Sequence, residues 1–259
     1  MLFRSSIIYN NYGLGLYQLK QYANAAEAYH ESISISRILA NDNPAKYNYH
    51  FAKTLNNIGA TLHNLGKYDD AIAAYKEALD TCTAMSAQDP PQYNDLMADT
   101  LVNYGLTLCD LEQFSEAAAT QKQAVSLYRN LGHERTLELC DALHNYGNSC
   151  YALGTHAEAV LAYQESIPLQ RARVATDPQQ KIYLRRALHN IANCFNVLGK
   201  CVEADAAAIE ALERNDGRVF EWCGYAPGFK SCFVCQRVMK RVHRKRDKIL
   251  GFRSRTRAQ

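Results

Sequence analysis

Three cysteines and one histidine near the C-terminal end of the chain have residue types and a spacing that could hold a metal ion. Cys223, Cys232 and Cys235 fall within thirteen residues, and His243 follows them. Together they could supply the four tetrahedral ligands that Zn²⁺ takes in structural sites. A single Cys-x2-Cys pair is not specific for zinc, and the alternative is an unliganded, poorly ordered tail. We therefore expect no cofactor, with zinc in the tail as the lesser of the two interpretations.

The common catalytic motifs are missing from the sequence. No Gly-x-x-x-x-Gly-Lys loop occurs, so a nucleotide phosphate has no such cradle. His133 and Glu134 begin like the helix of a zinc protease, but Leu137 stands where that helix needs its second histidine. Cysteines at core positions of helices usually act as small apolar side chains. We therefore expect a protein that is not an enzyme.

Charge divides the chain into an acidic body and a basic tail. The net charge is +3, but the residues from Lys230 onward contribute +10 and the residues before it −7. Such a cluster could bind nucleic-acid phosphates or an acidic surface, or act as a nuclear import signal. The alternative is a solvated end without a partner.

The most regular polar feature is an asparagine that stands two residues before a glycine or an alanine. An amide side chain carries both hydrogen-bond donors and an acceptor, which suits it to bind the backbone of another chain. The five copies, spaced by 46, 46, 42 and 45 residues, are Asn11, Asn57, Asn103, Asn145 and Asn190. Self-similarity at this period predicts stacked repeats, which offer one long surface rather than a catalytic pocket.

Each repeat has the pattern of two antiparallel helices. In the second repeat Leu55, Ile58 and Leu62 recur at steps of three and four residues, which places them on one apolar stripe of a helix. Gly66 follows, and glycine can take the left-handed conformation that ends a helix. A second helix then follows, and one alanine in it, here Ala71, recurs at the same position in every repeat. The small residues of both helices should let the pair approach closely.

Helix starts and one interruption are also marked in the sequence. Asn43, Asp89 and Asp177 each precede a proline, the arrangement of a capping residue before the first helical position. Thr155 with Glu158 has the spacing of a capping box. Pro168 falls inside a helical stretch, where it should kink the helix or end it near the preceding residue.

A family resemblance rests on the second repeat. Residues 54–59 read Thr-Leu-Asn-Asn-Ile-Gly, and residues 65–71 read Leu-Gly-Lys-Tyr-Asp-Asp-Ala. This text resembles the tetratricopeptide repeat, in particular the repeat class of kinesin light chain. The resemblance implies an all-α fold, a right-handed α-solenoid of about five helix-turn-helix repeats. The expected divisions are a solenoid over residues 1–214, with repeats at 3–40, 44–87, 91–131, 134–176 and 178–214, and a basic cysteine-containing tail, poorly ordered, over 215–259.

In that family the first helix of each pair lines a concave groove. The repeated asparagine, which we call the anchor, points into it. The resemblance therefore implies an asparagine ladder that bonds the backbone of an extended peptide. The alternative is that the asparagines satisfy neighbouring helices or loops inside the scaffold. The residues expected in the groove are Asn11, Asn57, Asn103, Asn145, Asn190, Lys53, Asn56, His63, His144, Asn148, Arg186, His189 and Asn193.

We expect a non-enzymatic adaptor that binds extended segments of protein ligands, with exposed solenoid ends that favour self-association. The first helix should leave Leu2 and Ile8 partly exposed, so we also expect more chain or a partner against it. The rival hypothesis is a regulator that binds zinc, nucleic acid or both through the tail. No run of eighteen apolar residues predicts a membrane span. Nine irregularly spaced cysteines favour the cytoplasm, with the nucleus as the alternative that the basic tail allows.

Overall fold

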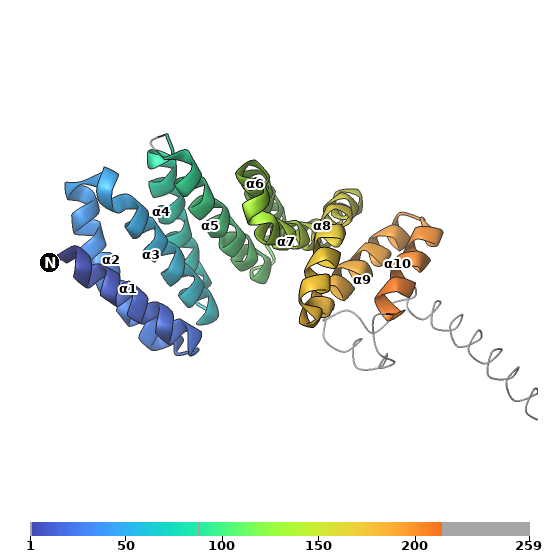
Figure 1. Cartoon of the computed structure of the whole chain (residues 1–259), viewed down its shortest axis with the longest axis horizontal. Coiled ribbons are helices and arrows are strands. Elements are labelled where there is room, and N and C mark those ends of the chain that lie inside the picture. The colour runs from blue at the N-terminus through green and yellow to red at the C-terminus, as the bar shows by residue number, and fades with distance from the viewer. Residues whose placement is uncertain (1, 88, 214–259) are drawn as a thin grey trace, which may run out of the picture. The chain divides into compact units, whose positions relative to one another are not determined.

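Helices account for all the regular secondary structure that the computed structural model describes, which covers residues 2–87 and 89–213. Figure 1 shows the helices in chain order. The α-helices are α1 (Leu2–Gln18), α2 (Tyr22–Asp42), α3 (Pro44–Asn64), α4 (Tyr68–Met85), α5 (Pro90–Asp110), α6 (Phe114–Leu131), α7 (Thr136–Leu153), α8 (His156–Thr176), α9 (Lys181–Val197) and α10 (Cys201–Glu213). Two 3-10 turns, η1 (His133–Arg135) and η2 (Pro178–Gln180), precede α7 and α9. Among these helices, none combines the length and the apolar character that crossing a membrane requires.

The chain divides into two compact units, with the boundary after Ser149 inside α7. The first unit holds α1 to α6 and most of α7, and the described part of the second holds the end of α7 with α8, α9 and α10. Helices that follow one another in sequence pack as pairs: α1 on α2, α3 on α4 and α5 on α6 in the first unit, and α9 on α10 in the second. The predicted all-α fold of helix-turn-helix repeats is confirmed.

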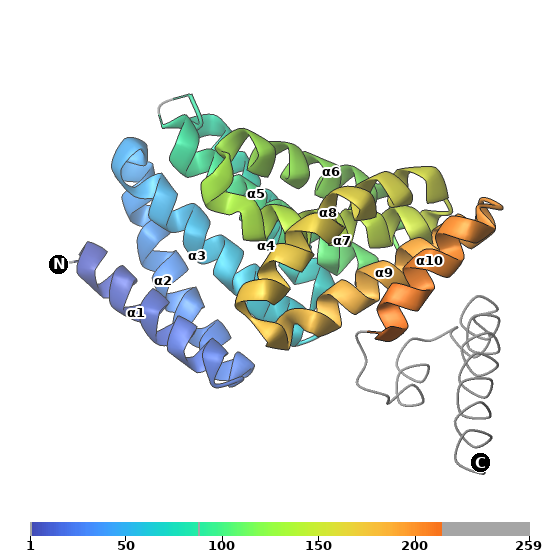
Figure 2. The same cartoon turned by 45° about the vertical axis from the view of Figure 1, so that its right-hand side comes forward.

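Inside the first unit, the first helices of successive pairs lie side by side. The helix α3 contacts both α1 and α5, while α2 packs on α3 and α4 packs on α5. Figure 2 shows α1, α2 and α3 as neighbours from a second direction. Residues that are one repeat apart in sequence therefore become neighbours in space, which is the condition for a surface built from equivalent positions.

The two helices of a pair touch closely at the small residue of the first helix. A Cβ atom added to Gly13 would lie 2.9 Å from the ring of Tyr29, and one added to Gly105 would lie 2.6 Å from Cγ of Gln121. Side chains do not approach a real Cβ this closely, so only glycine fits without a shift. The prediction that small residues of the first helix permit the close approach is confirmed.

The turns inside the helix pairs use a left-handed residue. Gly66 has φ +73°, and the backbone N–H of Lys67 donates to the carbonyl of Leu62 at 2.9 Å, so the last turn of α3 is closed as a C-cap. The other glycines predicted at this position also have positive φ. In the first and third pairs, Lys20 (φ +59°) and Glu112 (φ +58°) take the same conformation although each carries a side chain.

The predicted N-caps have different outcomes. Asp89 stands at the N-cap of α5 before Pro90, as predicted, but its side chain makes no cap bond. The side chain of Asn43 accepts a hydrogen bond from the backbone N–H of Lys46 at 3.2 Å, so the predicted cap of α3 is confirmed. Thr155 stands at the N-cap of α8 but makes no side-chain cap bond. Its hydroxyl instead donates to the carbonyl of Cys150 at 3.1 Å. The predicted capping box of Thr155 with Glu158 is wrong, because the preceding turn takes the hydroxyl.

The proline inside the fourth pair does not end its helix. Helix α8 runs from His156 to Thr176 with Pro168 inside it, so of the two predicted outcomes the end near residue 167 is wrong, and the kink stays a prediction. Proline removes one backbone donor, but packing on both flanks can keep a helix continuous across it. Asp177 then accepts a bond from the N–H of Gln179 at 3.0 Å, so this predicted cap is real but starts η2 rather than α9.

The core of the first unit lies between its helix pairs. The fixed alanine of the second helix is fully buried at residues 25, 71 and 117, and Tyr29 and Tyr75 are each 1% exposed. Leu55, Ile58 and Leu108 pack in the same cluster. Full burial of an aliphatic side chain of this size contributes about 1.5–3 kcal/mol. The stripe that the sequence predicted is therefore the one that holds neighbouring repeats together.

Candidate functional site

A series of hydrogen-bonded amide side chains connects the first helices of successive pairs in the first unit. The Nδ2 atom of Asn57 donates to Oδ1 of Asn10 at 3.1 Å, and Nδ2 of Asn103 donates to Oδ1 of Asn56 at 3.1 Å. In each case the anchor asparagine of one repeat bonds the residue just before the anchor of the preceding repeat. We call Asn10, Asn56, Asn57 and Asn103 the amide seam. It runs from α1 through α3 to α5.

Asn145 is the next anchor, and the seam stops before it. The residue that should accept its hydrogen bond is Val102, whose side chain has no acceptor. Asn145 is half-buried on α7, and within the described residues its side chain makes no hydrogen bond. Its amide therefore keeps its full hydrogen-bonding capacity, two N–H donors and one carbonyl acceptor.

Asn11 opens the series of anchors and lies exposed on α1. Its Oδ1 accepts a weak hydrogen bond from Nδ2 of Asn10 at 3.5 Å. Lys53, one helical turn before Asn57 on α3, is exposed as well. Both side chains can reach solvent or a ligand beside the seam.

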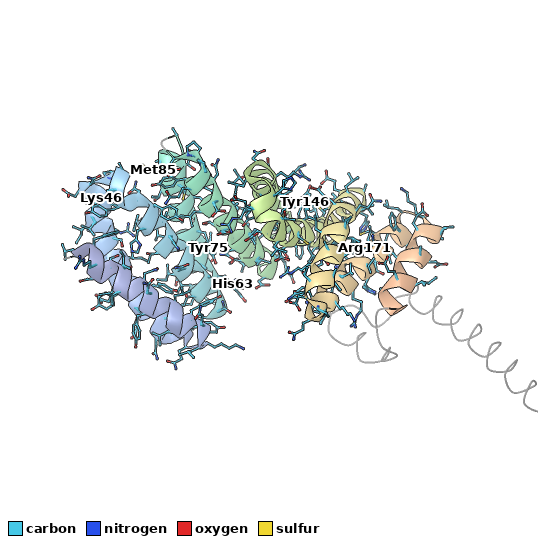
Figure 3. All side chains as sticks on the ribbon, in the orientation of Figure 1. Lys46, His63, Tyr75, Met85, Tyr146 and Arg171 are labelled. Carbon is cyan, nitrogen blue, oxygen red and sulfur yellow. The ribbon has the colours of Figure 1, made fainter. Side chains whose placement is uncertain are left out.

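His63 lies two turns beyond Asn57 on α3 and is labelled in Figure 3. Its Nδ1 is 2.9 Å from the hydroxyl of Thr107, and its Nε2 is 3.5 Å from a carboxylate oxygen of Asp110. The ring also packs edge-on against Tyr68, with centroids 5.6 Å apart. His63 thus continues the polar connection between α3 and α5 beyond the amide seam.

A buried polar cluster near the start of the chain escaped the sequence prediction. The hydroxyl of Ser6 is 2.5 Å from that of Ser36 and 2.8 Å from Nε2 of His50, while Ser32 donates to the Ser6 carbonyl at 2.9 Å. Burial lowers the pKa of His50, and nearby Lys53 lowers it further. The Ser6–His50 contact has the residue types of a nucleophile and a base. Because Ser6 is fully buried, we assign the cluster to packing of α1, α2 and α3.

A second polar network joins α5, α6 and the start of α7. The hydroxyl of Tyr128 donates to Oδ1 of Asp99 at 2.5 Å. Arg135 forms ion pairs with Asp95 and, at 2.8 Å, with Glu138. Burial raises the pKa of Asp99. The carboxylates on this part of α5 are therefore engaged inside the unit rather than presented as a free acidic surface.

The predicted residues of the second unit are placed differently from those of the first. Asn190 donates to the hydroxyl of Tyr163 at 3.3 Å, a contact inside the scaffold. His189 is only 3% exposed, its Nε2 is 3.1 Å from Nδ2 of Asn193, and burial lowers its pKa to about 4. Arg186 is exposed on α9. Of this set, Arg186 is the side chain that reaches solvent most freely.

Two further predicted residues, His144 and Asn148, are half-buried on α7 in the first unit. The predicted zinc ligands in the tail, Cys223, Cys232, Cys235 and His243, lie outside the described residues. Within residues 2–87 and 89–213, no group of three or more His, Cys, Asp or Glu side chains is arranged to hold a metal ion. The expectation about zinc in the tail stays a prediction.

Comparison with protein families identifies the repeats. Tetratricopeptide-repeat models match residues 52–82 and residues 96–172. The matched segments include the repeated asparagines Asn57, Asn103 and Asn145. The chain contains tetratricopeptide repeats over these residues, as the sequence resemblance predicted. Comparison with curated proteins finds no significant match.

Solved structures of the same fold include proteins of the kinesin light chain type. BtubC (BKLC) from P. vanneervenii shares 16% identity with a TM-score of 0.61, and the match covers 88% of this chain and 94% of that one. A putative kinesin light chain from Podosopora anserina, built of nearly identical TPR-like repeats, shares 12% identity with a TM-score of 0.61, over 83% and 96% of the two chains. At these identities the likeness concerns the fold.

Proposed function

We propose that the chain is a non-enzymatic protein-interaction scaffold whose first unit binds an extended peptide along the amide seam and Asn145. One observation carries the proposal. Asn57 and Asn103 are held in place by a bond to the preceding repeat, and this bond uses one N–H of each amide. A second N–H and the carbonyl oxygen of each remain for a ligand.

Amides in this arrangement match the chemistry of a peptide backbone. An extended chain presents N–H and C=O groups at regular intervals of about 3.3 Å per residue, and an amide can both donate to one and accept from another. Recognition through the backbone gives affinity with little dependence on sequence. Exposed Lys53, one turn before Asn57, supplies a place for an acidic side chain of the guest.

Proteins of the same fold support this use of the surface. YrrB is a TPR protein with an unusual peptide-binding site. It shares 16% identity with this chain at a TM-score of 0.55, and the match covers 82% of this chain and 88% of YrrB. A Rap protein with a TM-score of 0.56 occurs in complex with Competence and Sporulation Factor. Peptide recognition is therefore compatible with this fold. In the proposed function, the amide side chains of the seam and of Asn145 supply the mechanism.

The test separates binding from stability by choosing asparagines with different internal roles. Peptides are selected from a random display library on the full chain, and their dissociation constants are measured by fluorescence anisotropy. Asn145→Ala removes no internal hydrogen bond, so it should weaken binding about two- to tenfold, the worth of one neutral hydrogen bond. Its thermal unfolding midpoint should not fall. Asn41→Ala, an exposed amide of α2 outside the seam, is the matched control.

Asn103→Ala should weaken the same peptides and should also lower stability, because it removes the bond to Asn56. Full affinity in both Asn145→Ala and Asn103→Ala, with circular dichroism unchanged, would place the ligand elsewhere and overturn the proposal. A loss of affinity in Asn41→Ala as large as in Asn145→Ala would have the same consequence, because it would show that the amides of the seam have no special role.

A further inference from the structure

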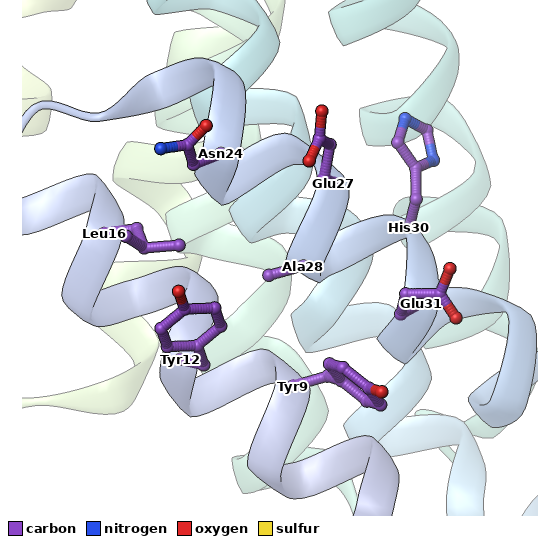
Figure 4. Close-up of a pocket in the computed structure, with 8 residues that line it drawn as sticks. All are labelled: Tyr9, Tyr12, Leu16, Asn24, Glu27, Ala28, His30 and Glu31. Atoms are coloured by element: carbon purple, nitrogen blue, oxygen red, sulfur yellow. The ribbon is translucent and has the colours of Figure 1, made fainter.

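A cleft of about 540 Å³ is lined by residues of α1 and α2 (Figure 4). Tyr9, Tyr12 and Leu16 line it from α1, and Ala28 with Glu31 line it from α2. The aromatic side chains are exposed, Tyr9 by 39% and Tyr12 by 61%. Figure 4 shows the two rings beside each other on α1 with the carboxylate of Glu31 across the cleft. We call this surface the outer face of the first pair.

Equivalent positions in the next repeats show what this kind of surface does. Counting 46 residues onward, Tyr9 corresponds to Leu55 and Tyr12 to Ile58, which are both 2% exposed. The helix that packs on α3 from the preceding pair is α2. The same holds one repeat later, where α4 packs on α5. The residues of the outer face therefore occupy positions that, in the later repeats of this unit, are covered by the second helix of the preceding pair.

Charge adds a specific requirement to this geometry. Arg37 of α2 makes a two-pronged ion pair with Glu77 of α4, at 2.5 and 3.1 Å. The residue equivalent to Glu77 in the first pair is Glu31, in the cleft. The second unit repeats the device, because Arg171 of α8 pairs with Glu210 of α10 at 2.7 and 3.1 Å in the same register. Glu31 thus occupies the position at which, in other pairs, a glutamate forms an ion pair with an arginine from the second helix of the preceding pair.

We propose that the outer face of the first pair docks an amphipathic α-helix of a partner protein. The helix would lay small and aliphatic residues on Tyr9, Tyr12 and Leu16, and would pair an arginine with Glu31. This site lies on a different surface from the amide seam and binds a helix instead of an extended peptide. Tyrosine is a common anchor of such interfaces because it buries a large ring and keeps a polar tip.

The same register argues against a second copy of this chain as the occupant. A head-to-tail copy would bring its last pair to the outer face. The second helix of that pair, α10, carries no lysine or arginine within Cys201–Glu213 but four acidic residues. It therefore offers Glu31 no cation, and like charges disfavour the contact.

The test uses a helix whose packing in this protein is known. A labelled peptide of residues 22–42, which forms α2 and carries Arg37, is titrated against the full chain and followed by fluorescence anisotropy. Tyr12→Asp and Glu31→Arg should each weaken binding at least about tenfold, the size expected for a central interface residue. A peptide with Arg37→Glu should lose binding to the wild-type chain and regain it with Glu31→Arg. Leu14→Asp, at an exposed apolar residue of α1 outside the cleft, is the matched control.

Restored binding in the charge-swapped pair would establish both the site and its orientation. Binding that is indifferent to Tyr12→Asp and Glu31→Arg would mean that the peptide replaces the chain's own α2, and this would overturn the proposal. Concentration-dependent self-association of the wild-type chain that Tyr12→Asp abolishes would assign the face to a second copy and overturn the choice of partner. Asn145→Ala should leave this peptide's affinity unchanged, which distinguishes failure here from failure of the seam.

Discussion

Gly59 of α3 stands directly against the ring of Tyr75 of α4: a Cβ atom added at residue 59 would lie 2.5 Å from Cε1 of the tyrosine. Tyr75 is 1% exposed, so its ring has no free space into which it could move. Burial also raises the pKa of its hydroxyl. The second repeat is therefore built around a glycine and a buried aromatic ring that fit only each other.

Gly59→Ala should destabilise the first unit. Overpacking of a filled core costs about 1–3 kcal/mol, and the better helix propensity of alanine returns up to about 1 kcal/mol. We expect a net loss of about 1–2 kcal/mol in urea unfolding. Gly15 on α1 is the matched control, because a Cβ there meets nothing within 4 Å. Gly15→Ala should raise stability, and equal effects of the two changes would contradict the packing argument.

Lys20 and Glu112 hold the left-handed conformation in turns where other repeats use glycine. The left-handed conformation costs a residue with a side chain about 1–2 kcal/mol of free energy, whereas it costs glycine little. Lys20→Gly and Glu112→Gly should therefore stabilise the fold by roughly 0.5–1 kcal/mol each, after allowing for the greater freedom of glycine in the unfolded chain. Differential scanning calorimetry would measure the rise in melting temperature. Gly66→Ala should move it in the opposite direction.

The fold could be predicted from the sequence because its rule is periodic. Apolar residues at fixed positions, such as Leu55 and Ile58, define each stripe, and the repeat period supplies the pairing. Local ends were less predictable. Pro168 stays inside α8 because packing outweighs its local preference, and the Thr155 hydroxyl bonds the preceding turn instead of the predicted cap partner.

The candidate site could be predicted in part. The anchor asparagines are visible as a series, but their bonds run to Asn10 and Asn56, residues 47 positions earlier. Aligning the repeats would have revealed these partners, and also Val102 as the break. The cluster of Ser6 with His50 offered no such signal, because three ordinary serines and a histidine become a network only when three helices meet.

His189 gives the second unit a pH dependence on the acid side. Burial lowers its pKa from 6.5 to about 4, so the folded unit favours the neutral ring. Its stabilising contribution is complete above pH 6.5 and is lost as the pH falls from 6.5 towards 4, because the unfolded chain then binds the proton first. A shift of this size corresponds to roughly 3 kcal/mol at most.

Two measurements check this prediction. The ring proton resonance of His189 should titrate by NMR with a midpoint near pH 4, and His189→Gln should remove that resonance. The variant should also lose part of the acid-induced destabilisation between pH 6.5 and 4. A midpoint close to that of an exposed histidine would show that the ring is accessible to water, contrary to its 3% exposure.

The amide seam should contribute to the coupling between repeats, and a double-mutant cycle can measure it. Asn103→Ala leaves Oδ1 of Asn56 without its donor, and Asn56→Ala leaves Nδ2 of Asn103 without its acceptor. Each change should cost about 1 kcal/mol in urea unfolding, with a coupling energy of about 0.5–1.5 kcal/mol between them. Asn145→Ala should cost nothing, since Val102 offers its amide no partner. A coupling energy near zero would mean that helix packing alone holds the repeats together at the seam. The hydrogen bonds between the asparagines would then contribute nothing to stability.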